Sequence, residues 1–498
     1  MQTRPIRFFH RGAVVELNGV PATRTVLEWL REDARCTGTK EGCAEGDCGA
    51  CTVVLGSLDG AGALKLQPVN ACIQFLPTLD GQALFTVEDV ALAGGALHPV
   101  QQSMVDCHGS QCGFCTPGFV MSLWAGYQQH ACAGTVPSRQ QLADDLSGNL
   151  CRCTGYRPIL DAGEAAYQAS AVVMDTAPVL AALKSLSADP PLSTAGGSFH
   201  APQTLAAFAE LREAMPQAHV LAGSTDMGLW VTKQFRELPV VISIGKVDEL
   251  KQIAVHDGVL RIGAAASLEA GWRALVERWP ALHDLWLRFA SLPIRHAGTL
   301  GGNVANGSPI GDSAPVLMAL GATIVLQRGS VQRRLPLDGF YTGYMKNQLQ
   351  AGEFVHSLEV PLDTGSSTRT VRAYKISKRF DCDISALCLA ASFSRDGDRL
   401  TDVHVAFGGM AATVKRAAAV EAAMNGTPWT EAVAEAAAAA LVQDFQPLSD
   451  MRASAAYRLQ VAQNLIRRLW LETRSDAPLP ASMLSVWHRG DNPTTVAA

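Results

Sequence analysis

The segment Gly42-Cys-Ala-Glu-Gly-Asp-Cys-Gly-Ala-Cys51 decides the first part of the fold. Its cysteines have the spacing C-x4-C-x2-C, and Cys72 follows beyond two predicted strands, which is typical of a plant-type [2Fe–2S] site. Cysteines that point inward from so tight a loop need unusual backbone angles, which its glycines permit. The alternatives are a loop of buried free cysteines and a zinc site, although four-coordinate zinc usually takes paired C-x2-C knuckles.

A second cysteine quartet consists of Cys112-Gly-Phe-Cys115 and Cys151-Arg-Cys153. Pro117 indicates a helix start, where its missing N–H leaves no hydrogen bond unmade. Two helix starts that meet in a bundle would direct partial positive charge at an anionic cluster. Alone, this pattern is also compatible with zinc, but beside the first quartet it favours a second redox centre.

Cysteine is concentrated near the start of the chain, where 11 of the 13 residues lie before residue 154. Nothing in the sequence indicates secretion, so a disulfide framework is disfavoured and metal binding is favoured. Cys36, Cys107 and Cys132 belong to neither quartet and are expected to be packed thiols.

The composition of the 498 residues is that of a globular protein, with 48% apolar and 17% charged residues, and the length predicts three or four domains. A net charge of −5 argues against a nucleic-acid binder that works by bulk electrostatics. No run approaches the ~20 apolar residues of a membrane helix, and the first residues lack the apolar core of a signal peptide. We therefore expect a soluble, cytoplasmic protein without membrane or nucleic-acid partners.

The hydrophobic pattern predicts a multidomain α+β fold. In residues 1–90, alternation over 6–17, a hairpin turn at Asn18-Gly19, strands 51–55 and 64–68, and a helix Val26–Glu32 that begins with a Thr25/Glu28 capping box predict a small α+β domain. Residues 91–173 predict a four-helix bundle with helices 100–108, 118–129, 138–146 and 158–173. The Pro-, Ser-, Ala- and Gly-rich residues 174–195 predict a linker.

Two further domains are predicted beyond the linker. Residues 196–368 alternate strands (220–228, 240–244, 259–262, 322–326) with helices such as 268–277 and 281–289. Residues 369–485 predict an α+β C-terminal domain with strands 371–376, 384–393 and 402–408 and an amphipathic helix 453–472, followed by a tail, 486–498.

Two glycine-rich segments, Val220-Leu-Ala-Gly-Ser-Thr-Asp-Met227 and Thr299-Leu-Gly-Gly-Asn303, are candidate backbone cradles for a dinucleotide. Glycine allows main-chain N–H groups to reach a pyrophosphate. Neither segment is a G-x-G-x-x-G or Walker loop, which disfavours Rossmann and P-loop folds. Each segment alone is equally compatible with a structural turn.

The motifs around the second quartet are specific. Gln111-Cys-Gly-Phe-Cys-Thr-Pro-Gly118 and Gly148-Asn-Leu-Cys-Arg-Cys-Thr-Gly-Tyr-Arg157 resemble the helical [2Fe–2S] domain of the xanthine oxidase family of molybdenum hydroxylases. The resemblance implies that a β-grasp ferredoxin-like domain precedes this four-helix [2Fe–2S] bundle. It implies two clusters, with these iron ligands: Cys43, Cys48, Cys51, Cys72, Cys112, Cys115, Cys151 and Cys153.

The same resemblance extends to the family's flavin domain, which has a vanillyl-alcohol-oxidase-like fold, and implies FAD. The implied FAD-binding residues are Val220, Leu221, Ala222, Gly223, Ser224, Thr225, Asp226, Met227, Phe289, Thr299, Leu300, Gly301, Gly302, Asn303, Asp312, Val355 and Lys375. Asp312 would hold sugar or ribityl hydroxyls, and Phe289 would cover the isoalloxazine ring unless it is a core residue.

The segment Tyr374–Ile384 resembles the family's stretch at the flavin edge, where NAD approaches. Lys378, Arg379 and Asp383 would tune the flavin potential or bind dinucleotide, and a solvated charged loop is the alternative. Cys382 stands where relatives often have a polar or acidic residue, which puts the local electrostatics in doubt.

The resemblance implies an electron-transfer subunit, since the chain ends at Ala498 without a molybdenum-pterin domain, as in the family's split bacterial form. A large molybdopterin-binding partner would oxidise hypoxanthine or xanthine to urate, in a heterotetramer of two small and two large chains. Electrons would pass through the helical-domain cluster, the ferredoxin-like cluster and FAD to NAD, and no residue here is nominated as catalytic.

Related carbon monoxide dehydrogenases usually carry clusters and flavin on separate chains. A reductase that runs from NADH to another protein and a zinc-stabilised scaffold are the alternatives.

Overall fold

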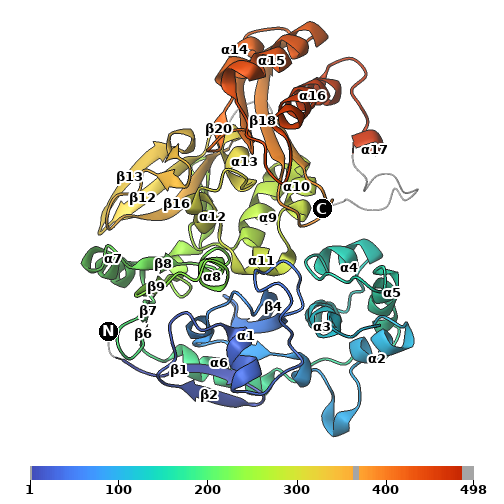
Figure 1. Ribbon diagram of the computed structural model, residues 1–498, viewed down its shortest axis with the longest axis vertical. Coiled ribbons are helices and arrows are strands. Elements are labelled where there is room, and N and C mark those ends of the chain that lie inside the picture. Colours follow the sequence, from blue (N-terminus) through green and yellow to red (C-terminus); the bar gives the residue numbers. More distant parts are fainter. Residues whose placement is uncertain (1–2, 363–368, 485–498) are drawn as a thin grey trace.

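The computed structural model describes residues 3–362 and 369–484, and the predicted tail and the boundaries at 368 and 485 lie outside these ranges. Figure 1 shows the domains stacked along the long axis, with the two cysteine-rich domains below, the domain predicted to bind FAD (here called the flavin domain) in the middle and the C-terminal domain above. The predicted α+β multidomain fold is confirmed. Among the described helices, none is both long and apolar enough to cross a membrane.

The first domain is a five-stranded sheet with strand order β2-β1-β5-β3-β4 and one helix, α1. The bounds are β1 Ile6–His10, β2 Ala13–Leu17, β3 Thr52–Leu58, β4 Leu64–Asn70, β5 Ala83–Phe85 and α1 Val26–Glu32. The capping box between Thr25 and Glu28 is present as predicted. The predicted hairpin turn at Asn18-Gly19 is wrong, because the strands turn at Arg11 and Gly12, whose positive φ values of 50° and 80° suit a two-residue hairpin.

The second domain is the predicted bundle, with α2 Pro99–Asp106, α3 Thr116–Ala133, α4 Arg139–Asp145 and α5 Arg157–Ala166. The last helix ends at Ala166 and not at Val173. Its core is shared with the ferredoxin-like sheet, because Trp124 of α3 packs on Phe85 of β5 with ring centroids 5.5 Å apart. The two cysteine-rich domains therefore hold each other in a fixed arrangement.

The predicted linker at 174–195 is partly wrong, because it contains a helix, α6 Ala177–Ser187, and a strand, β6 Leu192–Ser193. Val179 and Leu183 of α6 are buried in the shared core of the first two domains. Alanine and leucine favour a helix, and this intrinsic preference outweighs the Pro and Ser residues at the ends of the segment. The segment therefore packs as part of the fold.

The flavin domain has two lobes. The first contains the sheet β6-β7-β9-β8 with α7 and α8; the second contains the antiparallel sheet β10-β11-β16-β12-β13. The bounds are β7 Phe199–Ala201, α7 Leu205–Ala214, β8 His219–Leu221, α8 Met227–Thr232, β9 Val241–Ser243, β10 Ile253–His256, β11 Val259–Gly263, α9 Leu268–Arg278, α10 His283–Arg288, α11 Leu292–Ala297, α12 Leu300–Asn306, α13 Ser313–Ala319, β12 Thr323–Arg328, β13 Val331–Pro336, β14 Tyr341–Gly343, β15 Lys346–Asn347 and β16 Phe354–Pro361. The predicted strand 220–228 is wrong beyond Leu221, because Ser224 has a positive φ of 65° and α8 begins at Met227.

The C-terminal domain is an antiparallel sheet, β17-β18-β19-β20, covered by helices (Figure 1). The bounds are β17 Thr370–Ile376, β18 Leu387–Asp396, β19 Arg399–Gly408, β20 Lys415–Arg416, α14 Ala418–Met424, α15 Glu431–Asp444, α16 Ala455–Thr473 and α17 Ala481–Leu484. The predicted strands and the helix 453–472 are confirmed within a few residues.

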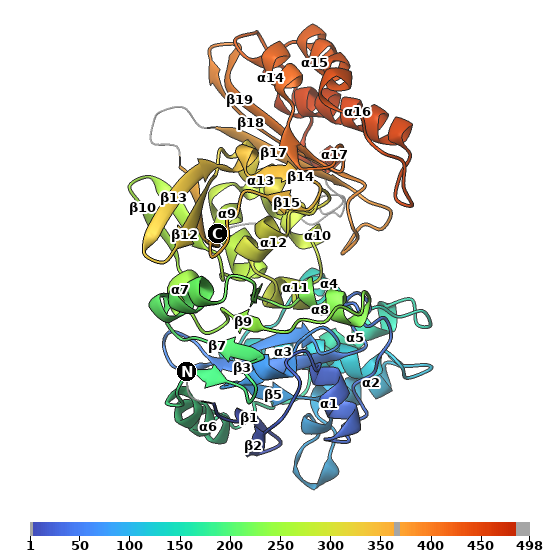
Figure 2. The same ribbon diagram turned by 60° about the vertical axis from the view of Figure 1, so that its left-hand side comes forward.

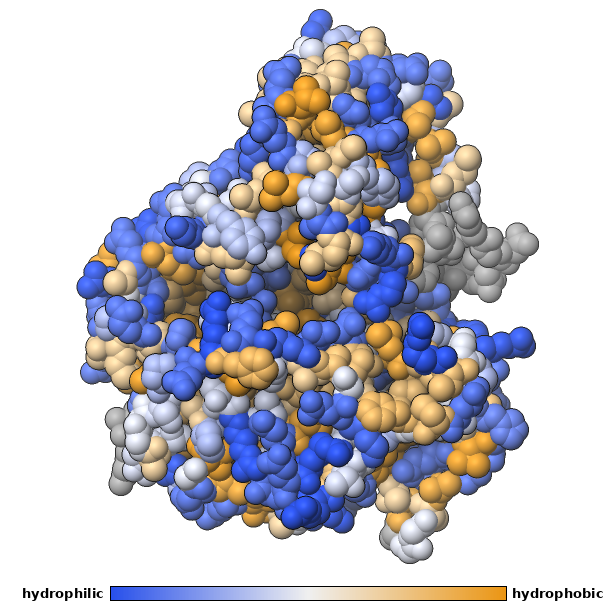
Figure 3. All heavy atoms as spheres, viewed as in Figure 1, coloured by the Kyte–Doolittle hydropathy of each residue, from blue (hydrophilic) through white to orange (hydrophobic). Residues whose placement is uncertain are grey.

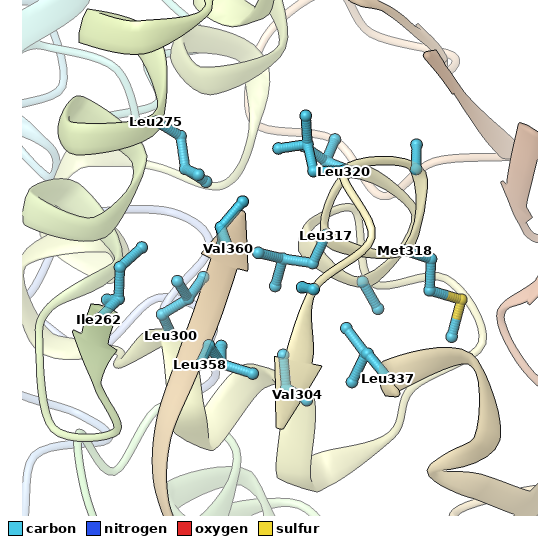
Figure 4. Close-up of a cluster of buried hydrophobic side chains, with 14 of the residues drawn as sticks. Ile262, Leu275, Leu300, Val304, Leu317, Met318, Leu320, Leu337, Leu358 and Val360 are labelled. Carbon is cyan, nitrogen blue, oxygen red and sulfur yellow. The ribbon is translucent and has the colours of Figure 1, made fainter. Parts of the chain in front are cut away.

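Hydrophobic cores cross the domain boundaries. Phe8 and Leu84 of the ferredoxin-like sheet share one core with Phe199 and Val241 of the flavin domain, and Figure 2 shows β7 and β9 directly above that sheet. A second core, drawn in Figure 4, brings Leu300 of α12 against Ile262 and Leu358. These cores fix the cysteine loops relative to the glycine-rich segments.

Candidate iron–sulfur centres and flavin site

The first quartet comes together beside the ferredoxin-like sheet. Cys43, Cys48 and Cys51 lie on the loop between α1 and β3, and Cys72 follows β4. The Cys48 N–H donates to Cys43 Sγ (3.3 Å). The thiol of Cys43 is within hydrogen-bond reach of Cys48 and Cys72, and the thiol of Cys51 is within reach of Cys72. Contacts with Cys43 and Cys51, together with burial, raise the pKa of Cys72. Thiols this close cannot all ionise unless a cation shares their charge.

The glycines of this loop are required by close packing. Gly49 has a φ of 71°, and a Cβ there would lie 2.3 Å from the carbonyl oxygen of Gly148. Gly46 has a φ of 79°, and a Cβ there would lie 2.6 Å from Ile73 Cδ1. Only glycine therefore fits at these positions while the loop stays in contact with the helical domain and the segment after Cys72.

The second quartet lies at two helix starts, as predicted. Cys115 is the N-cap residue of α3, while Cys151 and Cys153 precede α5, whose N-cap residue is Tyr156. Its thiols also associate in pairs, Cys112 with Cys153 and Cys115 with Cys151. Burial and the contact with Cys151 raise the pKa of Cys115 to about 12. Burial disfavours ionisation of Cys151, but hydrogen bonds from Thr154 outweigh it and lower the pKa of Cys151.

Both quartets fit a binuclear iron site. Within residues 3–362 and 369–484, no group of three or more His, Cys, Asp or Glu side chains is arranged to hold a metal ion. In each quartet the sulfur atoms contact one another, and a [2Fe–2S] cluster with four thiolates takes two of them on each iron. Cys151 is buried and Cys115 is half-buried, whereas Cys112 and Cys153 are exposed, so the second cluster would have an inner and an outer end.

The two quartets are joined by direct hydrogen bonds. The Leu150 N–H donates to the carbonyl oxygen of Cys48 (3.0 Å), so Cys48 of the first quartet contacts the residue before Cys151 of the second. Buried Asn149 donates from Nδ2 to the Gly49 carbonyl and to Thr52 Oγ1 (both 3.1 Å). Its Oδ1 accepts from Ser122 Oγ (2.6 Å). No sequence pattern indicated this role of Asn149, because Asn149 and Gly49 are 100 residues apart.

The first quartet also contacts the first glycine-rich segment. Ser224 Oγ donates to the carbonyl oxygen of Ile73 (2.6 Å), next to Cys72. Thr232 Oγ1 on α8 donates to the carbonyl oxygen of Ala44 (2.8 Å), next to Cys43. A Cβ on Gly228 would lie 2.6 Å from the same Ile73 oxygen, so the backbone of α8 lies directly against the cysteine loop.

The glycine-rich segments form a close-packed cradle. Thr299 caps α12 by accepting the Gly302 N–H at Oγ1 (3.1 Å). A Cβ would lie 1.8 Å from the Ala297 carbonyl oxygen if added to Gly223, and 2.5 Å from Ala264 Cα if added to Gly301. Asn303 Oδ1 is buried and has no hydrogen-bond partner among the described residues. Figure 3 shows this face hollowed at the level of α8 and α12. The close approach of the backbone and the unpaired acceptor of Asn303 are compatible with the predicted dinucleotide cradle.

Several of the predicted flavin contacts have side chains in the hydrophobic cores. Leu221 and Met227 lie in the core shared with the ferredoxin-like sheet, and Leu300, Val355 and Phe289 lie in the core of the second lobe. Fully buried Leu221 and Leu300 have only main-chain groups to offer a ligand. Phe289 packs on Trp272 with ring centroids 5.7 Å apart, which agrees with the core alternative, and its contact with a flavin ring remains a prediction.

Asp312 and Lys375 form a buried ion pair, and each side chain is only 2% exposed. Lys375 Nζ donates to Asp312 Oδ2 (2.5 Å) and to Ser385 Oγ (2.9 Å), and Ser385 Oγ donates to Asp312 Oδ1 (2.6 Å). The sequence reasoning did not include Ser385, which lies directly after the segment singled out at the flavin edge. Both carboxylate oxygens of Asp312 therefore have protein partners, which leaves less of this side chain for sugar hydroxyls than the resemblance implies.

The flavin-edge segment reaches the first cysteine loop. Arg379 lies 3.3 Å from Asp47 and 3.6 Å from Asp383, and Lys378 Nζ donates to the carbonyl oxygen of Met451 (2.7 Å). Burial raises the pKa of the Cys382 thiol. Lys378 and Arg379 are exposed, which agrees with the solvated charged loop considered as the alternative, although Arg379 forms ion pairs with Asp47 and Asp383.

The cysteines outside the quartets differ from one another. Cys36 is buried as expected and Cys107 is half-buried, but Cys132 is exposed, so the prediction that it is a packed thiol is wrong. Cys132 lies in the last turn of α3, where the helix leaves the shared core.

Comparisons with known proteins agree with this architecture. Three family models match: a [2Fe-2S] binding domain at residues 86–164, the FAD binding domain in molybdopterin dehydrogenase at 193–363 and the CO dehydrogenase flavoprotein C-terminal domain at 372–473. Xanthine dehydrogenase of Emericella nidulans is 33% identical and covers 88% of this chain and 36% of its own length. Xanthine dehydrogenase of Drosophila subobscura is 32% identical, and the match covers 95% of this chain and 39% of that protein.

Solved structures match the flavin-binding part of the fold. A carbon monoxide dehydrogenase chain from Hydrogenophaga pseudoflava is similar with a TM-score of 0.51 and 25% identity, covering 56% of this chain and 96% of that chain. Quinoline 2-oxidoreductase from Pseudomonas putida 86 gives a TM-score of 0.52 at 22% identity, and the match covers 57% of this chain and 98% of that chain.

The fold and the two kinds of site define an iron–sulfur flavoprotein with [2Fe–2S]-binding and FAD-binding domains. Within that class, the chain belongs to the xanthine oxidase family of molybdenum hydroxylases. It spans little more than a third of the length of the curated relatives it matches, between 36% and 39% of the xanthine dehydrogenases named above.

Proposed function

We propose that this chain is the electron-transfer subunit of a cytoplasmic xanthine dehydrogenase. A partner with a molybdenum-pterin centre oxidises hypoxanthine or xanthine to urate, and this chain passes the electrons through two [2Fe–2S] clusters and FAD to NAD+. Membership of the family and the similarity to xanthine dehydrogenases over most of this chain support the proposal.

The residues that hold the cofactors follow from the two quartets and the cradle. The first cluster is bound by Cys43, Cys48, Cys51 and Cys72, and the second by Cys112, Cys115, Cys151 and Cys153. FAD lies along 220–227 and 299–303, with Asp312, Lys375, Val355 and Phe289 nearby. When bound, the clusters carry single electrons and the flavin combines them into the two-electron reduction of a nicotinamide.

One observation carries this order of cofactors: each site is hydrogen-bonded to the next. Leu150, beside Cys151, donates to the carbonyl of Cys48, and Ser224 in the flavin cradle donates to Ile73, beside Cys72. A route from the second quartet to the first and on to the flavin therefore runs through short protein contacts. The hydrogen bonds from Asn149 to Gly49 and from Thr232 to Ala44 stabilise these two contacts.

The large molybdopterin-binding subunit docks beside the outer end of the second quartet, where Cys112 and Cys153 are exposed. A hollow of 530 Å³ next to this end is lined by Leu97, Met104, Val105 and Pro117 among others. Val105 is 59% exposed and Leu97 44% exposed, so part of this surface is apolar and open. Such patches mark protein interfaces more often than free surface. The assembly contains two small and two large chains.

At the other end of the route, NAD approaches the flavin edge near the segment 374–384. Arg379 links this segment to Asp47 on the first cysteine loop. Its ion pairs with Asp47 and Asp383 hold the segment against the cluster site, and this supports a role for the segment in placing the acceptor beside the flavin.

The experiment that tests the function is anaerobic mixing of the complete complex with xanthine, followed by NAD+. Xanthine alone should bleach the flavin and cluster absorbance, and NAD+ should restore it with formation of NADH. If NADH bleaches both cofactors while no purine does, the chain instead belongs to a reductase that draws electrons from NADH. Zinc without visible cofactor absorbance would indicate the scaffold alternative.

A further inference from the structure

The turn that follows the second quartet places a hydroxyl on a cluster sulfur. Thr154 Oγ1 donates to Cys151 Sγ across 3.3 Å. The Tyr156 N–H donates to the same Thr154 Oγ1 (3.2 Å), so the oxygen is used as an acceptor and its own hydrogen is left to point at the sulfur. The direction of the Thr154 hydroxyl is therefore set by the backbone two residues later.

This turn is held in an unusual conformation. Tyr156 has a φ of 71°, in a region that residues other than glycine rarely adopt, and such backbone strain persists only where surrounding contacts impose it. The Tyr156 hydroxyl accepts the N–H of Cys151 (3.2 Å) and its ring lies 6.4 Å from that of Phe119. The tyrosine thus closes a ring of contacts that runs from Cys151 through Thr154 and back.

We propose that Thr154 is a positioning residue of the second centre, whose hydroxyl raises the reduction potential of the cluster held there; this rests on the proposed function. A reduced cluster has one more negative charge, shared over its sulfurs, so a hydrogen bond to a ligand sulfur stabilises the reduced form more than the oxidised form. In the first centre, the backbone N–H of Cys48 donates to Cys43 Sγ (3.3 Å), and the side chain of Asn70 lies with Nδ2 4.0 Å from Cys51 Sγ. Among side-chain donors, Asn70 is therefore the counterpart of Thr154. The shorter and oriented contact makes Thr154 the stronger of these two donors.

The test is a redox titration of the holo-complex followed by electron paramagnetic resonance, which resolves the two clusters. Thr154→Val keeps the shape of the side chain but removes the hydroxyl, while Thr154→Ser keeps the donor. We expect Thr154→Val to lower the equilibrium constant for reduction of the second cluster about tenfold, which is about 59 mV for one electron. Thr154→Ser and the remote control Thr135→Val should leave it unchanged, and the first cluster should not shift in any variant.

An unchanged midpoint potential in a Thr154→Val protein with full iron content would overturn the proposal. If that variant assembles no second cluster, Thr154→Ala is titrated in its place, with the same criterion. Loss of the cluster from both variants would make Thr154 an assembly residue and would also contradict tuning. Failure of the proposed function is separate, since it would appear as a missing second signal in the unmodified protein.

Discussion

Lys375 and Asp312 are the most deeply buried ion pair of the flavin site, and their partnership decides how a substitution there behaves. The removal of one member of such a pair leaves a charge without its partner in a low-dielectric environment, which is much more costly than an exchange of both members. When Lys375 alone is replaced, Ser385 remains as a hydrogen-bond donor to Asp312.

We predict that Lys375→Met lowers the free energy of unfolding by about 3 kcal/mol because it leaves Asp312 buried without a counter-charge. Lys375→Met combined with Asp312→Asn should recover part of that loss. Urea denaturation of the three proteins measures the difference. Equal losses in the single and double variants would show that the pair is not the source of the effect.

Gly302 tests the cradle at the level of a single Cβ. A Cβ at this position would lie 2.8 Å from Thr299 Oγ1, the atom that caps α12. We predict that Gly302→Val yields protein without FAD but with its full iron content, measured by flavin absorbance and iron analysis. The control is Gly339→Val, where a Cβ would meet nothing within 4 Å. Retained FAD in Gly302→Val would count against the cradle.

At the scale of the elements, α11 is joined to β4 of the ferredoxin-like sheet by a neutral histidine. His296 Nδ1 lies 3.3 Å from the carbonyl oxygen of Pro68. Burial lowers the pKa of His296 to about 4, although Glu269 acts in the opposite direction and Arg295 and Lys65 reinforce the effect of burial. The unfolded chain therefore binds a proton more readily than the folded chain below the usual histidine pKa of about 6.5.

A depressed histidine pKa predicts that stability is fully present above pH about 6.5 and is lost as the pH falls towards 4. His296 should contribute at most about 3 kcal/mol to this loss. Asp144 and Asp145, whose pKa burial raises to about 6, titrate in the same window with the opposite sign. The difference between the unfolding curves of the unmodified protein and His296→Gln isolates the histidine. A variant with the same acid sensitivity would contradict the assignment.

Local patterns predicted the elements well where the deciding contacts are local. The Thr25/Glu28 capping box started α1 at Val26, and the bundle helices followed their apolar period. The hairpin at Asn18-Gly19 failed because Arg11 adopts a positive φ beside Gly12 and takes the turn instead. Helix α6 was missed because the Pro and Ser residues of 174–195 favoured a linker, whereas its Ala and Leu residues favour a helix and Val179 and Leu183 add stability in the core shared by the two cysteine-rich domains.

The same rule applies to the sites. The cysteine quartets could be proposed from spacing, since three cysteines of the first lie on one loop and the second consists of two short motifs. Asn149 and Ser385 could not, because their partners Gly49 and Asp312 are 100 and 73 residues away. Contacts of this range depend on how whole domains pack, and no short pattern in the sequence encodes them.

For the molecule as a whole, the shared cores make the chain one continuous framework between the exposed end of the second quartet and the flavin cradle.

Val105 lies in the apolar hollow beside that exposed end. If the proposed molybdopterin-binding subunit docks here, we predict that Val105→Glu weakens its association at least tenfold, because the substitution would place a charge in a desolvated interface. Calorimetric titration of the two subunits measures the affinity. Val331→Glu, at an exposed position on β13, is the matched control, and an equal effect of both variants would contradict the docking surface.

The central claim is that eight cysteines hold two separate [2Fe–2S] clusters upstream of a flavin. Electron paramagnetic resonance of the dithionite-reduced holoprotein tests it most directly. The account predicts two distinguishable signals that together integrate to two spins per chain, and the loss of only one of them in Cys115→Ser with FAD retained. A single signal, no signal, or two signals that both survive Cys115→Ser would contradict it.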